Sequence, residues 1–202
     1  MRAALLCVLG LMACTATRSE LTPVARARVA SDYGSYSLRR VGVLPFEGAA
    51  IEIDHGKELQ ASFVAELSTQ VSWEIVSLTA ADLEELPQHD SLRRGRGKPE
   101  AILELARRYR LDGIVVGTVA ELSTWPQARA GIEVDLIASE TGIAIWSGRV
   151  QVDAAQQLTR EHLQRWLDDT RAEHAATETA EVWLMSPRRF SQFAAAQVAD
   201  LF

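Results

Sequence analysis

The chain has 202 residues, of which 48% are hydrophobic and 24% are charged, and its formal net charge is -6. These proportions are ordinary for a folded domain with a real core, and they exclude a chain that is disordered throughout. The negative charge argues against a general nucleic-acid binder, which needs a basic surface to displace counterions from phosphate.

The two cysteines, Cys7 and Cys14, both lie within the first fourteen residues. The remaining chain therefore has no disulfide, no thiolate nucleophile and no cysteine-based metal site. We expect its stability to come from the hydrophobic core alone.

The N-terminus has the pattern of an export signal. Met1-Arg2 gives a positive start, and an apolar run follows from Ala3 to Ala13. The run is too short to span a bilayer, which needs about 20 apolar residues, but it suits the core of a signal peptide. An ordinary cleaved signal with a chance cysteine is the alternative interpretation.

The end of this run, Leu11-Met12-Ala13-Cys14, resembles the lipobox of bacterial lipoproteins. The resemblance implies cleavage before Cys14, a diacylglycerol on its sulfur and often a third chain, such as palmitate, on the new amine. Each buried methylene contributes about 0.8 kcal/mol, so two or three chains hold a protein at a membrane. Thr15, in place of the aspartate that implies inner-membrane retention in enteric-type bacteria, favours the periplasmic face of the outer membrane.

The chain divides into a signal peptide, a tether and two folded parts. We expect a signal peptide over 1–13, the lipidated Cys14 and a polar tether over 14–38, an α/β periplasmic domain over 39–153 and a helical segment over 154–202. No repeat and no further membrane span is visible in the sequence.

Hydrophobic periodicity predicts the elements of the domain. Strands are expected at 39–46, 73–78, 113–122, 131–138 and 143–152, and helices at 56–71, 80–86 and 99–109. Two amphipathic helical stretches follow residue 154, the second interrupted at Ser186-Pro187, a suitable N-cap and first helical turn. Thr79 and Asp82 form a variant of the capping box.

The order of these elements indicates the fold class. The first half alternates strands and helices, which favours parallel pairing through right-handed crossovers. The second half is an antiparallel meander. We therefore expect an α/β (α+β) fold with one mixed sheet of about five strands, helices mainly on one face, and added C-terminal helices.

Three segments carry a family resemblance: Val43-Leu44-Pro45-Phe46, Asp112-Gly113-Ile114-Val115-Val116-Gly117 and Glu140-Thr141-Gly142. In this order they resemble the periplasmic domains shared by curli-secretion CsgG-like lipoproteins, LpoB-type activators of penicillin-binding proteins and the TolB N-terminal domain. Each segment has a packing reason. Pro45 ends a buried strand, Gly117 lets a neighbour approach closely, and Gly142 supplies the positive φ of a turn. The long hairpins of the curli channel are missing, which speaks against a membrane pore.

Few residues suggest catalysis or metal binding. No histidine pair has zinc-helix spacing, no serine lies in a Gly-x-Ser-x-Gly elbow, and no glycine loop suits phosphate. Glu121, Glu133 and Asp135 share the wet face of the meander, where carboxylates perform acid–base work or, more often, are simply solvated. We expect no catalytic residue, no metal and no cofactor.

The basic cluster Arg93, Arg94, Arg96 and Lys98 is the strongest charge feature, and we regard it as a possible partner-binding site. It could equally be a plain surface loop. The aromatic residues of the C-terminal helices, from Trp166 to Phe193, are expected in the core rather than in a docking groove.

The sequence thus favours a lipid-anchored, non-catalytic module that binds other envelope proteins in secretion or cell-wall synthesis and does not bind nucleic acid. The alternative is a homo-oligomeric ring or scaffold related to curli-type channels. An envelope hydrolase is the third hypothesis.

Overall fold

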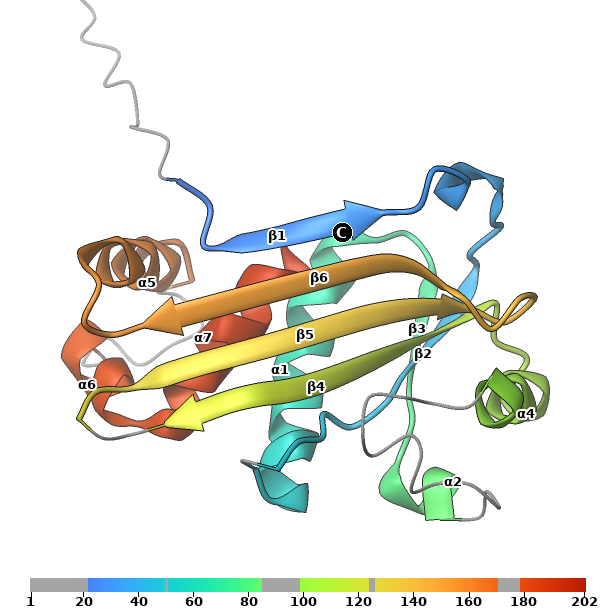
Figure 1. Cartoon of the computed structure of the whole chain (residues 1–202), viewed down its shortest axis with the longest axis horizontal. Helices are drawn as coiled ribbons and strands as arrows, with labels where there is room; N and C mark the ends of the chain where they lie inside the picture. Colours follow the sequence, from blue (N-terminus) through green and yellow to red (C-terminus); the bar gives the residue numbers. More distant parts are fainter. Residues whose placement is uncertain (1–21, 50, 85–98, 124–125, 171–178) are drawn as a thin grey trace, which may run out of the picture.

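The computed structural model describes residues 22–49, 51–84, 99–123, 126–170 and 179–202. They form one six-stranded sheet in the order β1-β6-β5-β4-β2-β3 (Figure 1). The strands are β1 Ala25–Val29, β2 Arg40–Val43, β3 Glu74–Ser77, β4 Gly113–Ser123, β5 Arg129–Ala138 and β6 Ala144–Asp153. The helices are α1 Ile53–Gln70, α2 Ala80–Glu84, α4 Pro99–Tyr109, α5 Gln157–Asp169, α6 Ala180–Met185 and α7 Pro187–Ala199, with a short 3-10 turn at Tyr33–Ser35.

The expected mixed sheet is confirmed. Strand β2 pairs in parallel with both β3 and β4, whereas β4, β5 and β6 form the antiparallel meander. The two crossovers leave β2 between β3 and β4. The carboxyl ends of β2 and β3 therefore lie side by side, with Val43 opposite Ser77, whereas β4 continues past them to Ser123.

The sixth strand, β1, differs from the sequence analysis, which placed its residues in the tether. It pairs antiparallel with β6, from Ala25 opposite Val150 to Val29 opposite Trp146. Its sequence alternates alanine with arginine, so it carries little of the apolar signal by which a strand is recognised. Just before β1, the backbone oxygen of Thr22 lies 2.8 Å from Nε2 of His162 on α5.

Helices α1 and α7 lie against one face of the sheet and against each other (Figure 1). The large side chains of this core are aromatic, and Phe46, Phe63, Phe190 and Phe193 are fully buried. The C-terminal Phe202 stacks on Trp146 of β6 with ring centroids 3.7 Å apart. The segment after residue 154 therefore shares one core with the sheet.

The opposite face of the sheet is only partly covered. Leu105 and Ala106 of α4 pack over β2 and β4, where Leu44, Ile114 and Val116 meet them. Beyond α4 the meander presents charged side chains, because alternate residues of β5 point away from the core. The prediction of helices mainly on one face is confirmed.

Local signals in the sequence act as predicted. The backbone N–H of Thr79 donates to Asp82 at 2.6 Å, and the N–H of Asp82 donates back to the Thr79 hydroxyl at 3.4 Å. Ser186 caps α7 by accepting from the N–H of Arg189. Gly142 has a φ of 69° in the β5–β6 turn. None of the described helices is long and apolar enough to cross a membrane.

Gly117 gives a direct test of the core. A β-carbon at this position would overlap the ring of the buried Phe46. We expect Gly117→Ala to lower the free energy of unfolding by about 2 kcal/mol or more, since overpacking a tight core forces side chains and backbone apart. Urea denaturation measures this. Gly34→Ala is the control, because nothing lies within 4 Å of an added β-carbon there. Equal stabilities of the two variants would contradict the prediction.

Candidate functional site

The residues that the sequence singled out for lipidation and partner binding lie outside the described part of the chain. These are Cys14 and the basic cluster Arg93, Arg94, Arg96 and Lys98. They remain predictions, and the structure places neither group.

The three carboxylates of the meander do share the open face of the sheet, but two of them have cross-strand partners. Glu133 lies opposite Arg149 and pairs with it at 3.4 Å. Asp135 accepts a hydrogen bond of 2.5 Å from the hydroxyl of Ser147. Such pairs stabilise neighbouring strands. No group of three His, Cys, Asp or Glu side chains within the described residues could hold a metal ion.

A histidine and a serine that sequence reasoning did not connect lie together between α1 and α7. Nε2 of His55 is 2.8 Å from Oγ of Ser191, although 136 positions separate them. A serine beside a histidine is the start of a nucleophilic site. Here, however, Ser191 is 0% exposed, and its hydroxyl donates to the backbone oxygen of Arg188 at 2.8 Å. The pair therefore links two helices and presents no nucleophile to a substrate.

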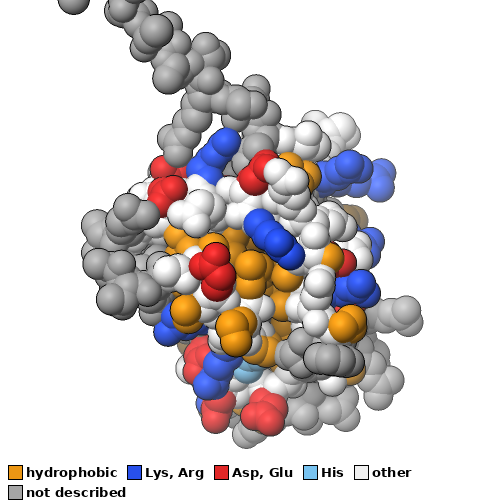
Figure 2. Space-filling view, turned by 90° about the vertical axis from the view of Figure 1, so that its left-hand side faces the viewer, with side chains coloured by type: hydrophobic (Ala, Val, Ile, Leu, Met, Phe, Trp, Pro, Cys, Tyr) orange, Lys and Arg blue, Asp and Glu red, His pale blue; other side chains and the backbone are white. Residues whose placement is uncertain are grey.

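Exposed apolar side chains gather at the end of the molecule where α5 and α6 lie. Figure 2 looks onto this end and shows a hollow lined by apolar groups and interrupted by single charged side chains. Two hollows of about 560 and 400 Å3 meet here and share Arg160, Leu184 and Met185. We call this surface the Met185 groove. Its lining residues are Pro126, Gln127, Ala128, Ala154, Gln157, Arg160, Glu161, Gln164, Ala180, Glu181, Leu184, Met185 and Pro187.

The short helix α6 produces this surface because one of its side chains anchors it. Trp183 is buried and contacts Trp166 of α5 edge to face, with centroids 5.0 Å apart. The helical turn then directs Val182 and Met185 outward, where they are 43% and 84% exposed. A methionine this exposed is unusual on a folded surface, and flexible thioether side chains suit binding surfaces.

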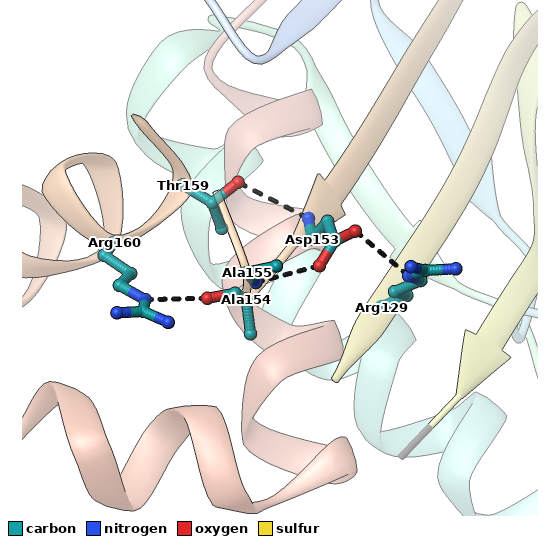
Figure 3. A network of polar contacts seen from close by, with 6 residues as sticks. All are labelled: Arg129, Asp153, Ala154, Ala155, Thr159 and Arg160. Atoms are coloured by element: carbon teal, nitrogen blue, oxygen red, sulfur yellow. Dashed lines mark hydrogen bonds and ion pairs between the residues drawn. The ribbon is translucent and has the colours of Figure 1, made fainter. Parts of the chain in front are cut away.

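A polar network fixes the β6–α5 corner beside the groove (Figure 3). Asp153, at the end of β6, accepts from the backbone N–H of Ala155 at 2.8 Å and pairs with Arg129 of β5 at 3.0 Å. Nε of Arg160 donates to the backbone oxygen of Ala154 at 2.7 Å. The β6–α5 corner is thus held rigidly, and one arginine is anchored across it.

A third hollow, of about 330 Å3, lies where the chain leaves β2 for α1. Its walls are mostly apolar, with Phe46, Ile51 and Ile53 among them, and Glu47 and Glu52 add two carboxylates. It lies near the carboxyl end of β2, where open α/β sheets commonly bind ligands. Nothing else in the described residues indicates what it would hold.

The groove was not predicted from the sequence. The aromatic residues Trp183, Phe190 and Phe193 were expected in the core, and their burial confirms this. The exposed large apolar residues of α6 are Val182 and Met185, which a helical pattern of this length does not distinguish from core positions.

The sequence matches no family model and no curated protein. Several solved structures align with this chain at low similarity. A PelC L103M dodecamer from Paraburkholderia phytofirmans aligns at TM-score 0.49 and 12% identity over 88% of this chain and 95% of that chain. Lipoprotein GNA1162 from Neisseria meningitidis aligns at 0.45 and 18% identity over 69% and 99%.

The LpoB C-terminal domain from Salmonella enterica, which belongs to the group named by the sequence resemblance, also aligns. Its TM-score is 0.38 and its identity 13%, over 57% of this chain and 84% of that chain. Similarities at this level carry no inference about what the chain binds.

The His55–Ser191 pair predicts a dependence of stability on pH. Burial and then the positive charge of Arg188 lower the pKa of His55, while Glu58 and Glu52 oppose the shift. A histidine whose pKa is lowered by folding contributes stability above its unfolded value of 6.5, and this stability is lost as the pH falls through the folded value.

We therefore expect the free energy of unfolding to fall between about pH 7.5 and pH 5, and to fall less steeply in His55→Gln. Urea titrations of both proteins across this range measure the slopes. Identical slopes would show that His55 does not contribute.

Proposed function

We propose that this protein is a lipid-anchored, non-catalytic binding module of the bacterial envelope, which docks another envelope protein in the Met185 groove. The observation that carries the proposal is the exposed apolar surface of α6 on an otherwise well-packed domain. Contiguous apolar surface bordered by polar groups marks interaction sites. Removal of apolar surface from water is favourable by about 25 cal/mol per Å2, before the entropic costs of association are subtracted.

The geometry of the groove suits a protein segment. The surface is an open hollow beside the β6–α5 corner, and the Arg129–Asp153 pair holds this corner in place. Rigid binding surfaces lose little conformational entropy when a partner binds. The proposed anchor at Cys14 would keep the domain at the periplasmic face of the outer membrane, where its partners would be other envelope proteins.

The anchor is tested by labelling cells with palmitate. We expect the wild-type protein to incorporate the label and to sediment with the outer membrane, because two or three acyl chains hold it there. Cys14→Ser removes the thiol that takes the lipid and is expected to lose the label and to leave the membrane fraction. Cys7→Ser is the matched control and is expected to keep both. Label on Cys14→Ser would contradict the proposal.

The docking surface is tested by placing a photo-crosslinking amino acid at Met185 in living cells. We expect a single adduct with one unrelated envelope protein, because this is the most exposed large apolar side chain of the groove. The matched control is Ile143, which is 63% exposed in the β5–β6 turn, away from the groove residues.

Equal adducts at both positions, or none at Met185, would refute docking in the groove. An adduct with twice the mass of the chain would instead support the ring or scaffold hypothesis.

A further inference from the structure

We infer that the segment held in the Met185 groove carries a carboxylate, which pairs with Arg160. This inference rests on the proposed docking function and specifies the chemistry of the partner: an apolar peptide segment with an aspartate or glutamate beside its apolar side chains. The argument starts from the position of Arg160, which lines both hollows of the groove.

The guanidinium of Arg160 is held by one edge only. Its Nε donates to the Ala154 backbone oxygen at 2.7 Å, which fixes its orientation. In the part of the chain that the structure describes, no ion pair is found for this side chain, and its two Nη groups have no hydrogen-bond partner. The planar fork of arginine matches the two oxygens of a carboxylate and forms two parallel hydrogen bonds with it.

Docking changes the environment of this charge. In the free protein Arg160 is exposed to water, but an apolar segment lying on Leu184 and Met185 would cover it. A charge removed from water without a partner is strongly unfavourable. An occupant that supplies a carboxylate avoids this cost, whereas one that supplies a lysine adds repulsion to it. Arg160 therefore selects among apolar segments by their charge.

The neighbouring acids of the groove do not fill this role. Glu161 accepts a hydrogen bond of 2.7 Å from Gln157. Glu181 lies in the first turn of α6, and hydrogen bonds from its own backbone N–H and from Thr179 lower its pKa. Both line the larger hollow, where they would repel a second carboxylate.

Among the residues that the structure describes, none of those lining the smaller hollow is acidic. Besides Arg160 it is lined by Pro126, Gln127, Ala128, Ala154, Leu184, Met185 and Pro187. The carboxylate of the partner is therefore expected on this side of Arg160, towards Pro187, with its apolar neighbours on Leu184 and Met185. The charge pattern thus fixes both the chemistry and the register of the segment.

The test is a selection from a random twelve-residue peptide library against the full-length protein held in lipid nanodiscs. The net charge of -6 attracts basic peptides at long range, so a preference for acidic ones requires a local contact. We expect aspartate or glutamate next to apolar residues to be enriched about tenfold, the ratio given by one good charge pair.

The variants make the result specific. Arg160→Gln is expected to abolish the acidic enrichment, and Arg160→Glu to replace it by lysine and arginine. Arg28→Glu, on the exposed part of β1, is the matched control and is expected to keep it. Met185→Ser is expected to lower the yield of all groove-binding peptides. Thermal melting checks that each variant is folded. If Arg160→Glu does not fold, the loss of acidic enrichment in Arg160→Gln tests the inference alone.

Selected peptides without acidic enrichment, an enrichment unchanged in Arg160→Gln, or no selected peptides at all would overturn the inference. The proposed function fails separately. If Met185 forms its adduct in cells while the peptides show no charge preference, docking stands and the role of Arg160 does not.

Discussion

The packing of α7 onto the sheet is the interaction on which the rest of the structure depends. Phe190 and Phe193 are fully buried beneath β5 and β6, and the run Ala194–Ala196 lets the helix approach the strands closely. Helix α6 joins α7 through the Ser186 cap, so the position of α7 sets the position of α6 and of the side chains that α6 exposes. The packing of the core therefore determines the shape of the groove, even though the groove lies on the surface.

Much of this fold could be predicted because its signals are local. Pro45 and the Thr79–Asp82 cap act within a few residues, and a single sequence contains that information. Gly117 predicted a close neighbour, but that neighbour, Phe46, is distant in the sequence and was not identified. Strand β1 could not be predicted, since alternating alanine and arginine becomes a strand only when β6 offers its edge. The groove was equally hidden, because the exposure of Met185 depends on Trp183 turning inward against α5, a long-range contact.

The His55–Ser191 pair shows why chemistry-bearing residues in contact do not by themselves define an active site. Ser191 is enclosed by α1 and α7, and its hydroxyl donates to a backbone oxygen. The hydroxyl therefore has a structural role and is not accessible to a substrate. Arg160 has the opposite character. One edge of its side chain is fixed by the backbone, and the other is open at a surface that excludes water only when something covers it. Binding specificity can reside in such a group without any catalytic chemistry.

The incorporation of β1 into the sheet also changes the geometry of the proposed membrane attachment. A tether ending at Leu38 would place 24 residues after Cys14, a contour of about 85 Å when fully extended. With Thr22 held against His162, the fixed point is only eight positions after Cys14, and the contour between them is at most about 28 Å. The shortened tether thus reaches the folded domain beside α5, the helix that forms one wall of the groove. A lipid on Cys14 would therefore keep this wall within a short distance of the bilayer, so that a partner would have to extend its segment down to the membrane to reach it.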